Sequence, residues 1–292
     1  MPELPEVQTT VSGLDKKIRG LTIDKVWTEY DSPYFYGSNT IKDPRYFKYF
    51  KKIVTGSKIT DVTRRAKNVL IHMSNGHTIL IHMKMTGHIM YGDYNKKDPY
   101  NRFIRLIFYL SNGKTMELCD SRKFAKVTLL ETNTMHETEH LKDLGPEPLE
   151  RKFTFPIFKA QLNKKFHGKI KLVLMDQTII AGIGNIYADE SLWRASIHPE
   201  EFVSDIKDKK LNELYLAIKA TLSKGIDFGG DSMSDYRNID GERGKFQEQH
   251  SAYRKTGTTC SKNGCNGKIV RIVVGGRSTH YCNAHQKLNK IV

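Results

Sequence analysis

The chain has 292 residues, of which 38% are hydrophobic, and this is enough for one large domain or two ordinary domains with apolar cores. No stretch approaches the roughly 18 consecutive apolar residues of a membrane-spanning helix, and the first residues do not read as a signal sequence, so we expect a cytoplasmic protein without membrane association. The formal net charge of +15 favours a polyanionic partner, most simply nucleic acid.

The chain begins MPELPEV, which predicts a helix that starts close to the N-terminus. Apolar residues recur at helical spacing from Val7 to Ile18, and Gly20 is a suitable end. Pro5 suits the first helical turn, where its missing N–H is not needed, and the negative charge of Glu6 there favours the helix dipole.

Pro2 also has a chemical interpretation. If Met1 is removed, the nitrogen of Pro2 is a secondary amine, and the reference pKa of an α-amino group is about 8, against about 10 for lysine. A free amine can attack an aldehyde-like carbon and form an iminium, the Schiff-base form of covalent catalysis. Glu3 and Glu6 lie beside it, and two neighbouring carboxyl groups can divide acid and base work. The alternative is that Pro2 only stiffens the start of the helix.

Residues 21–131 have the pattern of antiparallel β-sheet, in which short runs rich in β-branched and aromatic residues are separated by turns such as SNGH and SNGK. These runs are LTIDKVWTEY, VLIHM, HTILIHMKM, FIRLIFYL and KVTLLE. They predict a β-sandwich. Lys67, in RRAKNVLIHM, lies at the entrance to one strand, either in a solvated run of charge or as an amine and proton donor close to an anion.

The stretch LKDLGPEPLE at 141–150 predicts a boundary between domains. Beyond it the pattern becomes helical, whereas 228–247 is rich in Gly and Asp, lacks apolar periodicity and reads as a long functional loop. We therefore predict an α+β protein, with an N-terminal antiparallel β-sandwich, flanking helices and a C-terminal helical domain that ends in a zinc-finger β-hairpin. The predicted divisions are a domain over 1–140, a linker over 141–150, a helical domain over 151–250 that includes the loop 228–247, and a zinc finger over 251–292.

Four residues near the C-terminus have metal-ligand spacing. Cys260 and Cys265 are separated by four residues, and sixteen residues later Cys282 and His285 are separated by two. Three thiolates and one imidazole form a tetrahedral set that suits one structural Zn²⁺. The alternative is a buried thiol cluster with a histidine on the surface. Arg277 lies near the predicted hairpin turn, either in contact with a phosphate backbone or simply solvated.

Several stretches, taken together and in this order, identify a family by resemblance. They are PELPEV, RRAK, HMKMTG, LGPEPL, AGIGNIYADESLWRASIHP, GGDSMSDY with DGERGKFQ, and the terminal cysteine–histidine hairpin. They resemble the formamidopyrimidine-DNA glycosylase/endonuclease VIII family over essentially the whole chain. The resemblance implies a bifunctional enzyme of base-excision repair. Such an enzyme removes an oxidised base from double-stranded DNA, acts also on abasic sites, and nicks the strand by β- and δ-elimination.

The same resemblance implies roles for individual residues. Pro2 attacks C1′ of the damaged nucleotide and forms the Schiff base. Glu3 is a proton donor and acceptor in base release and ring opening, and Glu6 supports the site. Lys67 contacts phosphate and donates a proton for β-elimination, while Arg277 binds the phosphates that flank the lesion and assists δ-elimination.

A glycosylase must take the base out of the stack and fill the resulting gap, and apolar or cationic wedges do this. By resemblance, Met85 in HMKMTG and both Arg122 and Phe124 in DSRKF fill the gap, and Lys123 faces a phosphate. The alternative for Met85 and Phe124 is ordinary core packing. Ser121 and Lys123 replace the proline and arginine of the family's usual DPRRF.

The stretch GIGNIYADES resembles the helix–two-turn–helix of the family. Its glycines permit close backbone approach, and the side chain of Asn185 can donate a hydrogen bond to phosphate. The alternative is a tight turn between helices, capped by Asn185. Lys165, in NKKFHGKIK, is either a further phosphate contact or part of a solvated face. The family's usual zinc pattern is C-x2-C twice, so the four-residue spacing and the ligand His285 depart from it.

The 228–247 loop resembles the loop that covers 8-oxoguanine in the formamidopyrimidine branch, so we expect oxidised purines, namely 8-oxoguanine and formamidopyrimidines, as substrates. One alternative is a non-catalytic damaged-DNA-binding protein, against which the presence of Pro2, Glu3, Glu6 and Lys67 together argues. The other is an oxidised-pyrimidine glycosylase of endonuclease VIII type, against which the loop argues. We expect a nucleoid-associated monomer, since no self-association stripe is evident.

Overall fold

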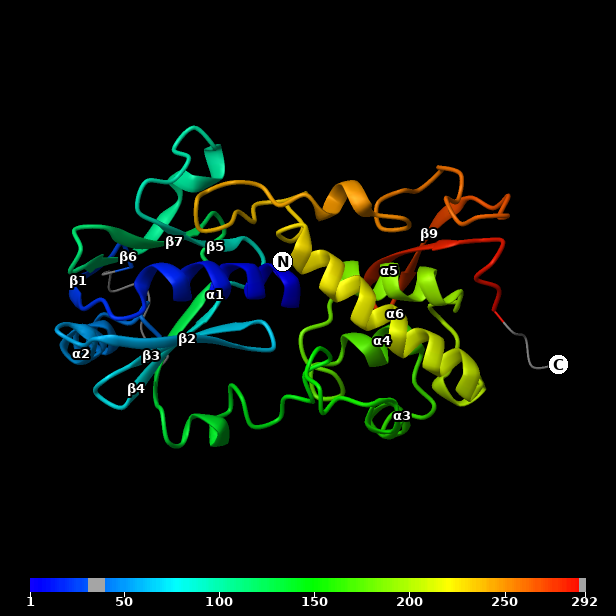
Figure 1. Cartoon of the computed structure of the whole chain (residues 1–292), viewed down its shortest axis with the longest axis horizontal. Helices are drawn as coiled ribbons and strands as arrows, with labels where there is room; N and C mark the ends of the chain where they lie inside the picture. Colours follow the sequence, from blue (N-terminus) through cyan, green and yellow to red (C-terminus); the bar gives the residue numbers. More distant parts are fainter. Residues whose placement is uncertain (31–39, 289–292) are drawn as a thin grey trace. The chain divides into compact units, whose positions relative to one another are not determined.

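The computed structural model describes residues 1–30 and 40–288, and it divides into two compact units (Figure 1). The first unit contains Met1–Lys142 together with Phe228–Gln247, and the second contains Asp143–Asp227 together with the residues from Glu248 onward. The chain passes from the first unit to the second within the predicted linker. Our expectation that the 228–247 loop belongs to the helical domain is wrong, because its backbone is bonded to the first unit.

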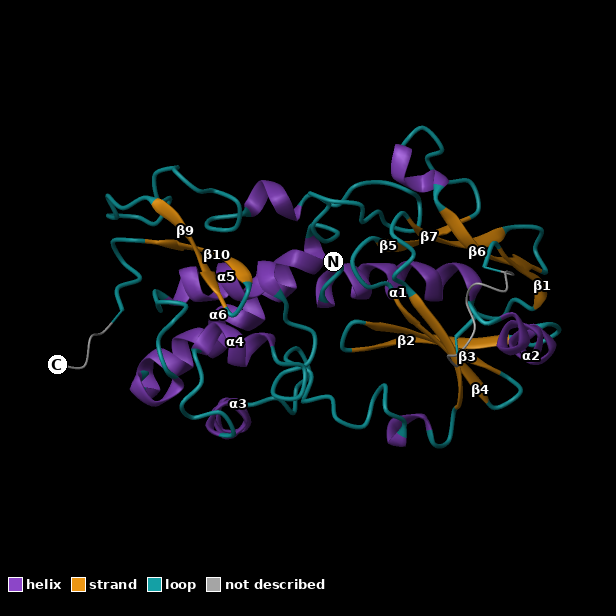
Figure 2. Ribbon diagram, turned by 180° about the vertical axis from the view of Figure 1, so that it is seen from behind, coloured by secondary structure: helices purple, strands orange, loops and turns teal. Residues whose placement is uncertain are grey.

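The first unit contains helix α1 (Leu4–Ile18) and two four-stranded antiparallel sheets. One sheet has the order β1 (Ile23–Thr28), β6 (Ile104–Leu110), β7 (Thr115–Asp120), β5 (Gly87–Tyr91). The other has the order β2 (Ile59–Arg65), β3 (Asn68–Met73), β4 (His77–His82), β8 (Lys126–Glu131). Figures 1 and 2 show α1 between the two sheets, where it contacts β2, β3 and β5.

The core of this unit follows from the patterns in the sequence. The apolar stripe of α1, from Val7 to Ile18, is buried, as the helical spacing predicts. Strand β6 alternates between buried and partly exposed residues, so one of its faces packs on the core. Helix α2 (Pro44–Val54) adds Phe50, which is fully buried and whose ring lies 6.3 Å from that of Phe108.

The second unit is helical and ends in a β-hairpin. Its helices are α3 (Phe155–Asn163), α4 (Ile170–Met175), α5 (Asn185–Ala195) and α6 (Asp208–Asp227), and its strands are β9 (Ile269–Val274) and β10 (Arg277–Cys282). Helix α5 packs on α6 and on β10 (Figure 2). The expected fold class, an antiparallel sandwich followed by a helical domain with a terminal hairpin, is confirmed. No helix in the described parts of the chain has the length and apolarity to span a bilayer.

Candidate active site and metal site

Three of the predicted catalytic residues lie together at the start of α1. Glu3 is the N-cap of the helix, and its backbone N–H donates to Glu6 Oε2 at 2.7 Å in the reciprocal arrangement of a capping box. Pro2 is buried, and Glu3 and Glu6 are 2% and 1% exposed, whereas Met1 is 38% exposed. The stretch therefore begins a helix, and Pro2 and the carboxyl groups of Glu3 and Glu6 are all buried at its start.

The carboxylate of Glu6 joins the N-terminus to the 228–247 loop. Oε1 of this carboxylate accepts a hydrogen bond from the backbone N–H of Asp231 at 2.7 Å. The backbone carbonyl oxygen of Glu6 accepts one from the hydroxyl of Tyr236 at 3.0 Å. Gly230 has a φ of +83°, and a Cβ atom on it would lie 2.8 Å from Glu6 Cγ. Both oxygens of Glu6 are thus bonded to backbone, which suits the supporting role implied for this residue.

The two ends of the loop are bonded to each other. Lys245 donates its N–H to the carbonyl of Phe228 at 2.8 Å, and Phe246 donates to that of Gly230 at 3.1 Å. Inside this neck the hydroxyl of Ser232, which is 1% exposed, donates to the Tyr236 carbonyl and accepts from the N–H of Gly244. The segment therefore has the closed neck of an Ω-loop.

The tip of the loop is bonded to the segment that follows β5. Tyr91 donates its N–H to the carbonyl of Ile239 at 2.7 Å, and Asn95 donates to that of Asp240 at 3.0 Å. The side-chain amide of Asn101 donates to the carbonyl of Gly241 at 3.1 Å. These bonds hold the tip on the first unit.

Lys67 lies in the turn between β2 and β3 and is 6% exposed. Ala66 before it has a φ of +52°, so the turn presents Lys67 at the entrance to β3, as the sequence predicts. His82 lies at the end of β4, opposite Asn68. Burial, with the positive charges of Lys84 and Lys67, lowers the pKa of His82 to about 3, so this histidine is neutral.

A buried carboxylate organises the turns that carry the predicted wedge residues. Asp120 is fully buried and accepts hydrogen bonds from the hydroxyl of Thr86, the N–H of Arg122 at 3.2 Å and the N–H of Ala125 at 2.7 Å. It therefore links the turn around Met85 to the turn formed by residues 120–125. No sequence pattern indicates this role, because it depends on donors from two separate turns.

The predicted wedge side chains are exposed at these turns. Met85 is 41% exposed and Phe124 is 47% exposed, so neither is packed in the core. The guanidinium of Arg122 lies 4.6 Å from the ring centroid of Phe124, within cation–π range. Lys123 has a φ of +59°, and its ammonium lies 3.0 Å from Glu29 Oε1, so binding a phosphate would require it to leave that carboxylate.

In the second unit, the predicted phosphate contacts Asn185 and Lys165 have protein partners. Asn185 is the first residue of α5, after the N-cap Gly184, and its side-chain amide donates to the carbonyl of Ser278 at 2.9 Å. The ammonium of Lys165 lies 2.6 Å from Asp176 Oδ2. Asn185 therefore joins the start of α5 to the hairpin.

Arg277 is exposed at the start of β10, next to the hairpin turn. Gly275 and Gly276 form that turn with φ values of +54° and +73°, as a two-residue type I′ turn requires. Two features set the position of Arg277: the hairpin turn, and the contacts that hold β10 on the helices.

A buried ion pair holds β10 on the helices. The ammonium of Lys171 lies 2.6 Å from Asp189 Oδ1, and both side chains are 0% exposed. Lys171 also donates to the carbonyl of Ser278 and to the hydroxyl of Thr279, and Asp189 Oδ2 accepts from the N–H of His280 at 2.8 Å. Helices α4 and α5 thus hold the backbone beside Arg277.

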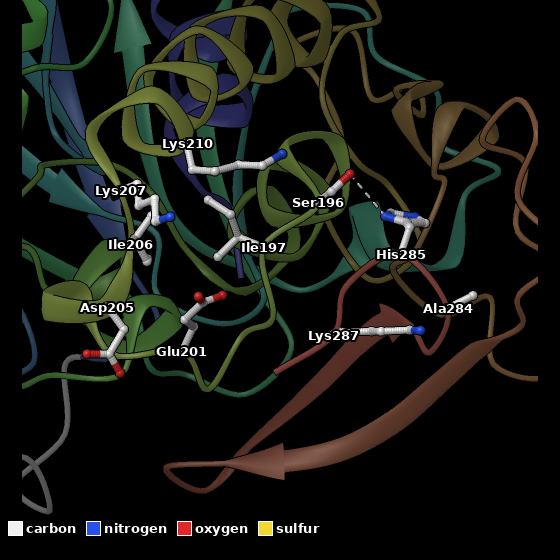
Figure 3. A pocket seen from close by; sticks show the side chains of 10 residues that line it. All are labelled: Ser196, Ile197, Glu201, Asp205, Ile206, Lys207, Lys210, Ala284, His285 and Lys287. Atoms are coloured by element: carbon white, nitrogen blue, oxygen red, sulfur yellow. Dashed lines mark hydrogen bonds between the residues drawn. The ribbon is translucent and has the colours of Figure 1, made fainter. Parts of the chain in front are cut away.

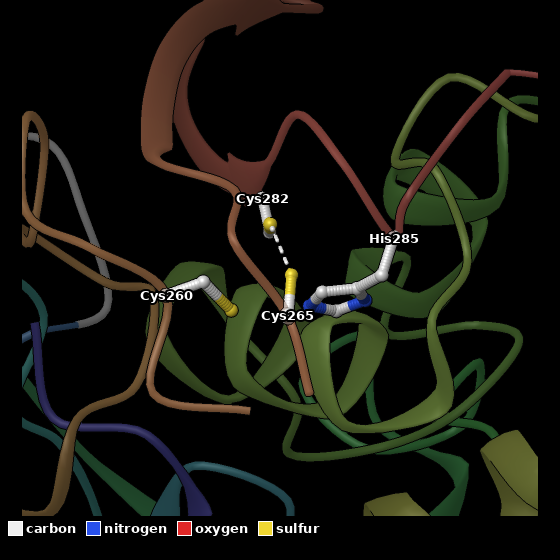
Figure 4. A group of neighbouring side chains, drawn as sticks. All are labelled: Cys260, Cys265, Cys282 and His285. Atoms are coloured by element: carbon white, nitrogen blue, oxygen red, sulfur yellow. Dashed lines mark hydrogen bonds between the residues drawn. The ribbon is translucent and has the colours of Figure 1, made fainter. Parts of the chain in front are cut away.

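The predicted metal ligands form one cluster (Figure 4). The ligand atoms of Cys260, Cys265, Cys282 and His285 all lie within 4.8 Å of one another, and the sulfurs of Cys265 and Cys282 are 3.6 Å apart. A tetrahedral zinc with Zn–S bonds of about 2.3 Å separates two sulfurs by about 3.8 Å, whereas a disulfide bond is about 2.0 Å long. The spacing fits a shared metal ion, and the alternative of a surface histidine apart from the thiols is wrong.

The histidine is oriented as a metal ligand. Its Nδ1 lies 3.1 Å from Ser196 Oγ, while its Nε2 is buried and has no hydrogen-bond partner among the described residues. A ligating histidine typically makes such a bond with its other ring nitrogen. Burial, then the charge of Lys262, lowers the pKa of His285 to about 4, so the imidazole is neutral, as ligation requires.

A cavity of about 500 Å³ lies beside this cluster, and His285 forms part of its wall (Figure 3). Its charged lining is mixed, with Lys207, Lys210 and Lys287 against Glu201 and Asp205. Pro2, Glu3 and Glu6 are not among the residues that line this cavity.

Comparisons with known proteins show the family to which the chain belongs. The family model of the formamidopyrimidine-DNA glycosylase N-terminal domain matches residues 1–127, and that of the formamidopyrimidine-DNA glycosylase H2TH domain matches residues 144–237. The formamidopyrimidine-DNA glycosylase of Pelotomaculum thermopropionicum is 39% identical over 99% of this chain and 100% of its own length. That of Bacillus subtilis is 36% identical over 97% and 98%. The chain belongs to the formamidopyrimidine-DNA glycosylase family.

Solved structures of this family resemble the whole chain. The complex of the Lactococcus lactis Fpg with DNA containing an abasic site has a TM-score of 0.82 at 32% identity, covering 96% of this chain and 97% of that one. MutM in complex with DNA containing carbocyclic 8-oxo-G has a TM-score of 0.82 at 33% identity, covering 96% and 98%. The recognition made from the motifs is confirmed: this formamidopyrimidine-DNA glycosylase family member is a DNA repair enzyme of the glycosylase class.

Proposed function

We propose that this chain excises oxidised purines, namely 8-oxoguanine and formamidopyrimidines, from double-stranded DNA through a Schiff base at Pro2, and then nicks the strand. The observation that carries the proposal is the buried group of Pro2, Glu3 and Glu6, on which the 228–247 loop closes through Gly230 and Asp231. A catalytically silent DNA-binding protein would not need a candidate nucleophile, Pro2, together with the acid–base groups Glu3 and Lys67. The proposal requires that Met1 be removed, so that the nitrogen of Pro2 is a free amine.

In the proposed reaction the nitrogen of Pro2 bonds to C1′ as the bond from C1′ to the damaged base breaks. Glu3 is the nearest carboxyl group in sequence, and it exchanges the protons of base release and sugar-ring opening, which leaves an iminium at C1′. Loss of a proton from C2′ then breaks the C3′–O bond in β-elimination, with Lys67 as the proton donor. A second elimination breaks the C5′–O bond, assisted by Arg277 at the flanking phosphates.

The remaining predicted residues bind and shape the DNA. Met85, Arg122 and Phe124 fill the gap that the extruded base leaves, and their exposure at two linked turns supports this role. Asn185, Lys123 and Lys165 contact phosphates after exchanging their present partners. One Zn²⁺ bound by Cys260, Cys265, Cys282 and His285 would stabilise the hairpin that carries Arg277. We further propose that the protein acts as a monomer at the nucleoid.

Trapping with borohydride tests the proposal, because reduction converts the iminium to a stable covalent adduct. The full-length protein is incubated with duplexes that carry 8-oxoguanine, an oxidised pyrimidine or an abasic site. We expect adducts at Pro2 with the 8-oxoguanine and abasic duplexes, and Pro2→Gly should greatly reduce them. The neighbouring Pro5→Ala variant controls for damage to the start of α1.

Each other outcome has a meaning. Adducts mainly with the oxidised pyrimidine would assign the endonuclease VIII type of specificity. No adduct on any duplex, with the N-terminal sequence verified to begin at Pro2, would refute the Schiff-base mechanism.

A further inference from the structure

The middle of the 228–247 loop lies between its two anchored parts. The neck is bonded to Glu6 and the tip to Tyr91, Asn95 and Asn101, as described above. Residues 233–235 lie between these anchors, and Met233 is 40% exposed. Ser121, in the turn that follows β7, contacts this segment: its hydroxyl donates to Asp235 Oδ2 at 2.6 Å.

Ser121 occupies a defined place in the 120–125 turn. Its neighbour Asp120 is fully buried and accepts from the N–H groups of Arg122 and Ala125, so the backbone on both sides of Ser121 is fixed. The next residues are the exposed Arg122 and Phe124, which lie against each other. The Ser121 hydroxyl thus connects the turn that carries these two side chains to the middle of the loop.

We propose that Ser121 is a positioning residue whose hydrogen bond to Asp235 couples the 120–125 turn to the 228–247 loop. Insertion of Arg122 and Phe124 into the duplex and closure of the loop over the extruded base then occur together. This inference rests on the proposed function, because it assigns the loop to the base and the turn to the gap. A loop that is already held in place loses less conformational freedom when a base binds beneath it.

The coupling has a substrate-dependent consequence. Excision of 8-oxoguanine needs an ordered loop over the base, whereas an abasic site offers no base to cover. A hydrogen bond to a charged acceptor is worth enough for its loss to slow a step by about tenfold. Ser121→Ala should therefore lower kcat/KM for 8-oxoguanine excision by about tenfold, mainly through kcat, and change cleavage of a preformed abasic duplex by less than about twofold.

The experiment compares Ser121→Ala, Ser121→Thr, Asp235→Ala and the double variant Ser121→Ala/Asp235→Ala on both duplexes. Threonine keeps the hydroxyl and should retain most of the 8-oxoguanine activity. The double variant should be no slower than either alanine variant alone, because both remove the same bond. Ser74→Ala is the matched control, since its hydroxyl accepts a backbone hydrogen bond at an exposed site between β3 and β4.

Hydrogen exchange of the free full-length protein gives a second measurement that does not depend on activity. The amides of residues 233–236 should exchange faster in Ser121→Ala and Asp235→Ala than in the wild type or Ser74→Ala. Unchanged exchange, equal losses on both duplexes, or fully additive losses would each overturn the coupling. If the wild type cuts neither duplex, the proposed function fails, and the exchange rates still decide whether Ser121 holds the loop.

Discussion

Gly230 has no room for a side chain. A Cβ atom would lie 2.8 Å from Glu6 Cγ and 2.9 Å from Glu6 Oε1, and the φ of +83° is unfavourable for any other residue. Because Glu6 also bonds the N–H of Glu3, a displacement at Gly230 would reach the capping box at the start of α1. A side chain at this one position in the loop would therefore disturb the hydrogen bonds of Glu6 at the start of α1.

Gly230→Ala should lower the free energy of unfolding by about 3 kcal/mol, from backbone strain together with the steric clash, and should abolish base excision. Gly113→Ala is the control for strain alone, because Gly113 has a φ of +75° but no atom within 4 Å of the added Cβ. It should cost about 1 kcal/mol and leave excision unchanged. Urea unfolding and an excision assay measure both effects, and equal losses in the two variants would contradict the steric argument.

At the scale of elements, the β9–β10 hairpin depends on two separate attachments. The ion pair of Lys171 and Asp189 holds β10 on α4 and α5, and the cysteine–histidine cluster closes the far end of the hairpin. The first attachment is buried and independent of metal. The second would depend on the proposed zinc ion, because metal–ligand bonds would then supply the attachment among these four side chains.

Metal removal should therefore loosen the hairpin before it affects the sheets of the first unit. The ring centroid of Trp193 lies 5.8 Å from that of His285, so in a Trp27→Phe variant the fluorescence of the remaining tryptophan reports on the cluster. Chelation should change this fluorescence and weaken DNA binding, while the far-ultraviolet signal of the sheets persists. Cys119→Ala is the control, since Cys119 is buried in β7 outside the cluster. Unaltered DNA binding by the metal-free protein would show that DNA recognition does not depend on the ordered hairpin.

At the scale of the whole molecule, the net charge of +15 makes the salt dependence of DNA binding a direct measurement of phosphate contacts. Arg277→Ala should weaken binding to all duplexes and lower the slope of log K against log[salt] by about 0.9, which is the loss of one contact. Arg271→Ala makes the same change of charge on β9, where its side chain donates to the hydroxyl of Ser278. A slope that both variants lower equally would indicate a general effect of charge.

The sequence predicts what depends on local spacing. The apolar stripe of α1, the hairpin and the cysteine–histidine set all follow from residues a few positions apart or from a short paired repeat. The grouping of the 228–247 loop with the first unit cannot be predicted in this way. It depends on hydrogen bonds such as that from Asp231 to Glu6, which lies 225 residues away in sequence. The role of Asp120 and the pairing of Lys123 with Glu29 cannot be predicted from the sequence for the same reason, because a single charged residue does not indicate which distant residue it contacts.

The return of residues 228–247 to the first unit has a consequence for synthesis. A ribosome makes the β-sheets first, then the helices α3–α6, and only afterwards the N–H of Asp231 that holds Glu6. A nascent or truncated chain that ends before residue 228 contains Pro2, Glu3 and Glu6 but lacks the segment that closes over them. During translation the proposed active site is therefore complete only after residue 231 has been made, when most of the protein already exists.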